Sequence, residues 1–305
     1  TTVAITASAA TTITGSASAV NTALSSSGIN GLGEEFVTLS GTTSVADANT
    51  VSGKTTGTVT ATISEGDAAT LVTLNETTNA YTITVTDGSV SAANLITLDG
   101  LTSVAVAVNS TTITGSASDV LSVYNANTAG TISGLGNEAV TISGTSSAAA
   151  DLNAINTATT GVVTVNSTTI TGTAADVKAI YDANNAGTIS GIGNEAVTIS
   201  DTTIGAGLLI TLDALTTGLI NAATVTTLTG TAAEIISLFI GPGLPGIIGL
   251  DNPGIIISDT TITASSLNTI DAYTSEAVTA TISTTDIGDL DDLTGTGNAY
   301  TITVA

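Results

Sequence analysis

The sequence predicts an α/β repeat fold: an elongated solenoid of about eleven rungs, each with short parallel strands and one short helix. Three observations support this prediction. Near-identical segments recur along the chain, segments of helical period follow one another at similar distances, and the segments between them alternate apolar residues with threonine. Self-similarity with a period of about 20–50 residues is typical of solenoids and arrays. We therefore expect residues 1–305 to form a single β-solenoid-like domain, or a subunit within a longer array.

The repetition is clearest in two long segments that are near copies of each other. TTITGSASDVLSVYNANTAGTISGLGNEAVTISGT begins at Thr111, and TTITGTAADVKAIYDANNAGTISGIGNEAVTISDT begins at Thr168. Looser copies align through most of the chain when each helical segment is anchored on one residue. The eleven anchors follow one another at similar spacings and are Ala19, Asp47, Thr70, Asn94, Asp119, Asp151, Asp176, Leu208, Glu234, Ser266 and Asp289.

The repeat that contains Asp176 shows the pattern expected for a helix. Val177, Ile180 and Tyr181 have the spacing of one apolar helical face. Thr173 is placed to cap the first turn, and Gly187 is placed to end the helix. We expect helices of about eight to ten residues, which are marginal alone and need packing against neighbouring repeats.

Short segments on either side of the helices alternate apolar residues with threonine, as strands with one buried face do. Examples are residues 163–165, 169–171 and 197–199. A flat, regular face of Thr-x-Thr segments could match an ice lattice. The unequal repeat lengths argue against one flat plane, and threonine is also a common residue on the solvent face of strands.

The charge balance excludes several classes of partner. The chain has 25 Asp and Glu residues but only Lys54 and Lys178 as cations, so its formal net charge is −23. Binding of nucleic acid needs Lys or Arg to neutralise phosphates, and anionic membrane surfaces are disfavoured for the same reason. Cys is absent, which excludes disulfides. The most apolar segment, residues 235–257, contains three prolines, which would break a membrane-spanning helix. We therefore expect no insertion into a membrane.

Glycine-rich turns of the longer repeats carry oxygen ligands of the kind that calcium prefers. The candidate metal ligands are Glu138, Asn137, Glu195, Asn194, Glu34 and Glu35. The alternative is that each Asn-Glu pair starts the next strand with its acid facing solvent. We favour this second interpretation because a single Glu in each turn supplies too few ligands.

No catalytic or cofactor-binding residue is predicted, and we expect the protein not to be an enzyme. The densest acidic cluster comprises Asp289, Asp291 and Asp292, with Asp286 nearby. Paired carboxylates can hydrolyse glycosides. At helical spacing, however, such a cluster more often forms a solvated turn. Arg and His are absent, and the two lysines lie five repeats apart.

Both ends of the sequence predict strands. Residues 298–304 repeat residues 79–85, and the first residues resemble the strand pairs that precede Asp119 and Asp176. Solenoids normally need polar capping repeats, and none is expected here. We therefore predict that copies of the chain bind head to tail through strands in 1–15 and 298–305, or that the chain is cut from a longer array. Met is absent, even at position 1, so we expect a processed product or an excerpt.

The segments TITGTAADVKAIY, GLGNEAVTISGT and DLNAINTATTGVV resemble the repeat regions of large, acidic bacterial cell-surface proteins. These are the haemolysin-type, adhesin-like repeat proteins that are frequent in cyanobacteria. The resemblance covers nearly the whole chain and implies secretion, surface attachment, or formation of a sheath or surface layer. The calcium-binding nonapeptide GGxGxDxUx of many such proteins does not occur in this sequence.

We therefore expect an extracellular structural protein that stacks end to end into a filament, sheath or surface layer. The alternative is an adhesive or ligand-binding module of a giant secreted surface protein, stabilised by calcium and binding surface polysaccharide. That module would use the acidic turns or the proline-containing loop 241–254.

Overall fold

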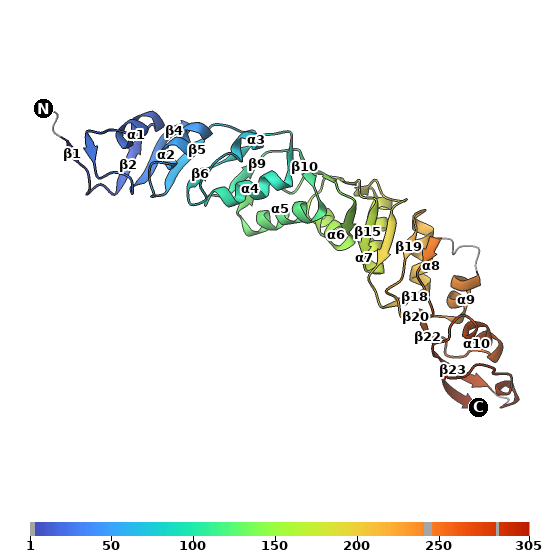
Figure 1. Cartoon of the computed structure of the whole chain (residues 1–305). Helices are drawn as coiled ribbons and strands as arrows, with labels where there is room; N and C mark the ends of the chain where they lie inside the picture. Colours follow the sequence, from blue (N-terminus) through green and yellow to red (C-terminus); the bar gives the residue numbers. More distant parts are fainter. Residues whose placement is uncertain (1–3, 241–245, 285–286, 305) are drawn as a thin grey trace. The chain divides into compact units, whose positions relative to one another are not determined.

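The computed structural model describes residues 4–240, 246–284 and 287–304. Contacts within the chain group it into two compact units. The first comprises residues 1–143 and 154–164, and the second comprises residues 144–153 and 165–305. Each unit consists of repeated α/β segments, in which short strands lead into a helix (Figure 1). That both units belong to one continuous repeat domain stays a prediction from the sequence.

The first unit begins with seven strands and three helices: β1 (Ile5–Thr6), β2 (Thr12–Gly15), α1 (Ala17–Leu24), β3 (Ile29–Asn30), β4 (Phe36–Thr43), α2 (Val45–Ser52), β5 (Val59–Ile63), α3 (Ala68–Leu71), β6 (Ala80–Thr82) and β7 (Thr84–Val85). It continues with β8 (Ser89–Ser91), α4 (Ala92–Leu101), β9 (Val106–Val108), β10 (Thr112–Gly115), α5 (Ala117–Ala129), β11 (Ile132–Ser133) and β12 (Ala139–Ile142). Helix α6 (Ala149–Ala158) and strand β14 (Val163–Val165) contribute residues to both units.

The second unit contains β13 (Ser146–Ala148), β15 (Thr169–Gly172), α7 (Ala174–Ala186), β16 (Ile189–Ser190), β17 (Ala196–Ile199), β18 (Thr203–Gly205), α8 (Ala206–Leu215), β19 (Ile220–Asn221) and β20 (Thr227–Gly230). It ends with α9 (Ala232–Ile240), β21 (Ile247–Ile248), β22 (Gly254–Ile257), α10 (Ala264–Asp271), β23 (Val278–Thr284), the 3₁₀ helix η2 (Ile287–Leu290) and β24 (Ala299–Val304).

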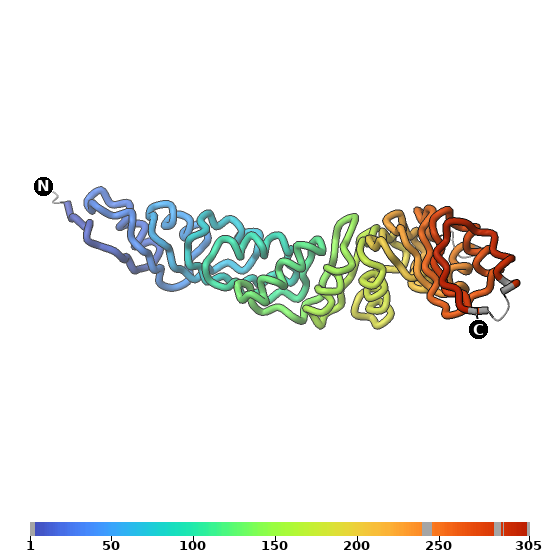
Figure 2. Tube along the Cα trace, turned by 90° about the horizontal axis from the view of Figure 1, so that it is seen from below, coloured from blue at the N-terminus to red at the C-terminus, as the bar shows by residue number. Residues whose placement is uncertain are grey.

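The strands form parallel sheets in which each strand pairs with its counterpart in the next repeat. Thr60 pairs with Ala80 across a short repeat, and Thr112 pairs with Ala139 across a longer one. In the first unit, the orders are β1-β3, β2-β4-β5-β6, β7-β9-β11 and β8-β10-β12. In the second unit, they are β13-β15-β17-β19-β21 and β18-β20-β22-β23-β24. Figure 2 shows consecutive repeats lying next to one another within each unit.

The predicted helix positions are confirmed. Within the described residues, each of the eleven anchors is the third residue of a helix, ten of which are α-helices and the last of which is η2. From α2 to α10, the residues one and four positions after the anchor are buried, as Val177 and Ile180 are in α7. Because these repeats each supply an apolar pair together with inward-facing strand residues, the cores are rich in Ile, Leu and Val.

Local sequence explains where the helices begin and end. Thr173 accepts a hydrogen bond of 3.1 Å from the amide of Asp176, and Gly187 ends α7 with φ of +81°, as predicted. The predicted length of eight to ten residues is wrong for α3, which has 4, and for α5 and α7, which each have 13. In α5 and α7 no glycine or proline interrupts the chain before the terminal glycine, Gly130 or Gly187, so the helix continues for a further turn.

Candidate functional site

A glycine–glutamate turn occurs three times, at residues 31–35, 134–138 and 191–195. It connects β3 to β4, β11 to β12 and β16 to β17. The first and third residues of each turn are glycines with positive φ: +86° and +130°, +92° and +134°, and +86° and +140°. Residues with a Cβ rarely adopt these values, so the Gly-x-Gly sequence fixes the path of the backbone.

The glutamate that ends each turn points inward. Glu35, Glu138 and Glu195 are 2%, 1% and 3% exposed, so the expectation that these acids face solvent is wrong. Each carboxylate accepts a hydrogen bond from the amide of the second glycine, at 2.7 Å for Glu35, 2.9 Å for Glu138 and 2.8 Å for Glu195. Amide donors replace the water that the carboxylate loses on burial, and the Gly-x-Gly backbone aims them at the carboxylate.

Two of the three glutamates also accept a hydrogen bond from a helix tyrosine. The hydroxyl of Tyr124 lies 3.2 Å from Glu138 Oε2, and that of Tyr181 lies 3.4 Å from Glu195 Oε2. Burial raises the pKa of both tyrosines above the ordinary value of 10.0, and the nearby carboxylate raises it further. Both hydroxyls are therefore neutral donors at physiological pH. In the first repeat the corresponding helix residue is Leu24, which has no hydroxyl.

A Thr-Thr-Gly segment of the following repeat closes over each turn. The first threonine donates from Oγ1 to the glutamate carbonyl: Thr55 to Glu35 at 2.7 Å, Thr159 to Glu138 at 2.7 Å and Thr216 to Glu195 at 3.4 Å. It also accepts a 3.0 Å hydrogen bond from the amide of the glycine that ends the segment. A Cβ on that glycine would collide with the glutamate carbonyl.

The remaining predicted ligands lie at the surface of the turns. Asn137, Asn194 and Glu34 are at least partly exposed, whereas the neighbouring glutamates are buried. Among residues 4–240, 246–284 and 287–304, no three His, Cys, Asp or Glu side chains gather closely enough to hold a metal ion. Each turn therefore offers one buried carboxylate, already hydrogen-bonded to amides, and calcium binding there stays a prediction.

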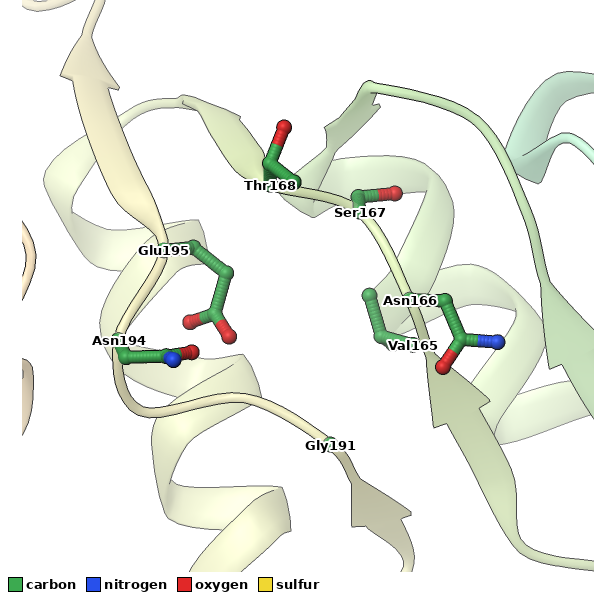
Figure 3. A pocket seen from close by; sticks show the side chains of 7 residues that line it. All are labelled: Val165, Asn166, Ser167, Thr168, Gly191, Asn194 and Glu195. Atoms are coloured by element: carbon green, nitrogen blue, oxygen red, sulfur yellow. The ribbon is translucent and has the colours of Figure 1, made fainter.

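A shallow depression of about 270 Å³ lies beside the third turn. Figure 3 shows Asn194 and Glu195 on one side and Val165 and Asn166 on the other. The residues that line it are mostly polar: Val165, Asn166, Ser167, Thr168, Gly191, Asn194 and Glu195. A larger depression of about 500 Å³ occurs at the equivalent place in the first repeat, beside residues 31–36. Small polar depressions of this kind suit water or a polar ligand better than an apolar one.

The turn at residues 249–253 is a variant without glutamate. Asn252 adopts φ of +55°, and its side-chain oxygen accepts a 2.5 Å hydrogen bond from the amide of Ser275. The carbonyl of Pro253 accepts from Thr274 Oγ1 at 2.7 Å, so the threonine contact with the following repeat persists. Residues 241–245 of the predicted contact loop lie outside the described part of the chain.

The predicted acidic cluster follows β23. Asp286 lies outside the described residues, and Asp289 belongs to η2. Asp291 and Asp292 are exposed, and the carbonyl of Asp292 accepts a 2.7 Å hydrogen bond from the side chain of Asn268. Rows of threonine across the strands are short: Thr38 pairs with Thr14 and with Thr60, whereas Thr112 pairs with Ser89 on one side and Ala139 on the other.

Four acids that the sequence analysis did not single out bind the start of a helix in the preceding repeat. A carboxylate of each accepts a hydrogen bond from the amide of the first helical residue: Glu65 from Val45, Asp87 from Ala68, Asp201 from Ala174 and Asp259 from Ala232. The bonds measure 2.6 to 3.1 Å. The sequence carried a signal for them, because each acid is the second residue after the end of a strand, namely β5, β7, β17 or β22.

No family model matches the sequence, and no curated protein or solved structure is significantly similar to it. Within the described residues, the helices are too short or too polar for any of them to cross a bilayer.

Proposed function

We propose that the chain is a structural repeat protein whose repeats stack as one solenoid and whose copies join end to end. The observation that supports this best is the pairing of each strand with its counterpart one repeat later, combined with apolar exposure on the outermost strands. Ile5 of β1 is 62% exposed, and Ile302 of β24 is 47% exposed. Among the described strands, β1 pairs with β3 alone and β24 pairs with β23 alone.

A strand with one free edge presents unpaired amide and carbonyl groups and readily pairs with another strand. Parallel pairing between copies would continue the pattern found inside each unit and would cover the exposed isoleucines. Apolar burial stabilises such a contact by about 25 cal/mol for each Å² removed from water. The assembled object would be a filament, sheath or surface layer.

The buried glutamates support a structural role. Their carboxylate oxygens are hydrogen-bonded to amides of their own turn, and in two turns also to tyrosine. These acids hold the turn between two repeats, and Glu35 and Glu195 also line the two depressions. We accordingly propose that the protein is not an enzyme and that the glycine–glutamate turns are part of its framework.

The proposed location is outside the cell or at its surface. The scarcity of lysine, the abundance of Thr, Ser, Asn and Gly, the strong acidity and the resemblance to bacterial surface repeat proteins support it. With 25 acids against two lysines, copies repel one another at low ionic strength, and salt reduces this repulsion. Assembly should therefore be favoured by dissolved cations.

Electron microscopy of the purified chain in moderate salt tests the proposal. Filaments or sheets with a regular repeat are expected, and single particles at all salt and protein concentrations would refute it. Ile302→Asp should abolish assembly because it places a charge on the joining edge. Ile256→Asp is a matched control, since Ile256 is 45% exposed but lies on β22, which has a partner on both sides.

The alternative function is an adhesive or ligand-binding module stabilised by calcium. The polar depressions beside the first and third turns favour it, because they recur at equivalent places. A ligand that binds only the folded state raises the melting temperature. Melting with calcium and with excess chelator distinguishes the cases: equal melting temperatures would remove calcium from this hypothesis.

A further inference from the structure

We infer that β24 of one copy pairs in parallel with β1 of the next, in the register that places Thr303 beside Thr6. This inference rests on the proposed end-to-end assembly and adds its register. It follows from the pairing of β7 with β9 inside the chain, because β7 is the equivalent of the end of β24 and β9 is the equivalent of β1.

The first step is that β23 and β24 repeat an internal pair of strands. Residues 298–304 have the same sequence as residues 79–85, and the strand before them repeats β5. The pairing is also the same, because Thr60 pairs with Ala80 and Thr279 pairs with Ala299. Even the side-chain contact recurs: Asn79 Oδ1 accepts the amide of Val59 at 2.7 Å, and Asn298 Oδ1 accepts that of Val278 at 2.8 Å.

The second step is that the internal copy shows what binds its free edge. Thr84 pairs with Ala107 of β9, and the amide of Ala107 donates to the carbonyl of Ile83 at 3.0 Å. Two residues further along both segments, the amide of Asn109 donates to the carbonyl of Val85 at 2.9 Å. With β8, α4 and β9 of the following repeat in place, Ile83 is 0% exposed, whereas its equivalent Ile302 is 47% exposed.

The third step is that β1 is the equivalent of β9. Ile5 and Thr6 pair with Ile29 and Asn30, just as Val106 and Ala107 pair with Ile132 and Ser133. Both partner strands lead into a glycine–glutamate turn. Ile5 therefore corresponds to Val106, which is 0% exposed, and Thr6 corresponds to Ala107.

The hydrogen-bonding groups of β1 are oriented as the junction requires. The amides of Ile5 and Ala7 donate to the carbonyls of Gly28 and Asn30, both at 2.8 Å. Since successive amides of a strand point to opposite sides, the Thr6 amide faces the free edge. Placed on β24 in the internal register, it would donate to the carbonyl of Ile302.

The charge distribution suits this contact as well. Despite the net charge of −23, residues 1–33 and 293–305 contain no Asp, Glu, Lys or Arg. The two strands can therefore pair without a charged side chain on either of them. Burial of Ile5 and Ile302 then stabilises the junction without a desolvated charge.

Disulfide cross-linking tests the register, because the chain has no native cysteine. Thr303→Cys chains are mixed with Thr6→Cys chains under mild oxidation, and a disulfide-linked heterodimer is expected. Both positions are exposed, so neither substitution should disturb folding, which circular dichroism checks. The matched control is Ser8→Cys, which lies in the turn two residues after Thr6. It should cross-link to Thr303→Cys about tenfold more slowly, because disulfides require Cα atoms within roughly 7 Å.

The outcomes separate this inference from the proposed function. If filaments form but Ser8→Cys cross-links as fast as Thr6→Cys, the register is wrong and end-to-end assembly stands. Cross-linking of Thr303→Cys chains with one another in preference to Thr6→Cys chains would indicate pairing of two β24 edges, which also overturns the inference. If neither filaments nor heterodimers form, the inference and the proposed function both fail.

Discussion

The carboxylate of Asp201 accepts a hydrogen bond of 2.7 Å from the amide of Ala174, the first residue of α7 in the preceding repeat. Three other helices start in the same way, with an acid from the next repeat at the N-terminal amide. The N-terminus of a helix carries partial positive charge, and its first amides have no partner within the helix. Part of the acidity of the chain therefore links neighbouring repeats.

Replacing Asp201 by alanine should lower the free energy of unfolding by about 1 kcal/mol, the usual value of a helix-capping interaction. Asp201→Asn should cost less, because it keeps an acceptor and loses only the attraction to the helix dipole. Chemical denaturation measures both. The exposed Asp251 offers a matched control, and Asp251→Ala should change stability by less than roughly 0.5 kcal/mol. Equal effects at the two positions would contradict this role of Asp201.

Two equivalent serines should respond in opposite directions to substitution by alanine. The hydroxyl of Ser167 lies 2.7 Å from that of Ser147, and both residues are buried. Ser167→Ala leaves Ser147 without its partner, so a loss of about 1–3 kcal/mol is expected. Ser110 occupies the same position one pair of repeats earlier, and its buried Oγ has no hydrogen-bond partner. Ser110→Ala should therefore be neutral or stabilising in the same denaturation assay.

Two glycines should also respond in opposite directions. A Cβ at Gly161 would collide with the carbonyl of Glu138, so Gly161→Ala must move the turn and should destabilise by more than about 2 kcal/mol. Gly100 lies in α4, where a Cβ would meet nothing within 4 Å. Gly100→Ala should stabilise by roughly 0.5–1 kcal/mol, because alanine loses less entropy in a helix. A loss of stability at Gly100 would count against this description of α4.

Stability should fall at alkaline pH because of the buried tyrosines. Burial raises the pKa of Tyr124 and Tyr181 in the folded protein above the ordinary 10.0. The stabilisation that these two protonated hydroxyls give to the folded protein is therefore fully present below pH 10. Above this pH the unfolded chain releases the phenolic protons while the folded chain retains them, and stability declines. Denaturation midpoints measured from pH 8 to 11 should show this decline.

The double variant Tyr124→Phe/Tyr181→Phe provides the control for the pH dependence. It should be less stable than the parent at pH 7, because Glu138 and Glu195 each lose a donor. The loss for each hydrogen bond to a charged group is about 1.5–3 kcal/mol. Its stability should also fall less steeply above pH 10. An unchanged slope would mean that these two hydroxyls do not account for the alkaline decline.

Much of the fold could be predicted from the sequence because it is written in local patterns. Alternation of Val, Thr and Val at 163–165 predicted a strand, and the spacing of Val177 and Ile180 predicted a buried helix face; both are confirmed. Helix starts were predictable because a hydroxyl residue such as Thr173 precedes the third helical residue by three positions. Parallel pairing followed from successive repeats that run in the same order of strand and helix.

The orientation of the turn glutamates could not be predicted in the same way. The buried carboxylate of Glu138 accepts from the amide of Gly136 and the hydroxyl of Tyr124, and its main-chain carbonyl accepts from Thr159 in the following repeat. These donors come from three separate segments, and hydrophobic periodicity carries no information about them. The sequence did contain one indication of buried glutamates. Gly-x-Gly-x-Glu is followed one repeat later by Thr-Thr-Gly, and this combination occurs three times in the chain.

The pairing of each strand with its counterpart in the next repeat has a consequence for how such a chain can change in length. Residues 111–145 and 168–202 are near copies whose starts lie one short and one long repeat apart, so such a pair of repeats is a natural unit of insertion or deletion. Loss or gain of one such unit in this region leaves each remaining strand with an equivalent neighbour. Unequal recombination within the gene would thus produce shorter and longer proteins that still fold.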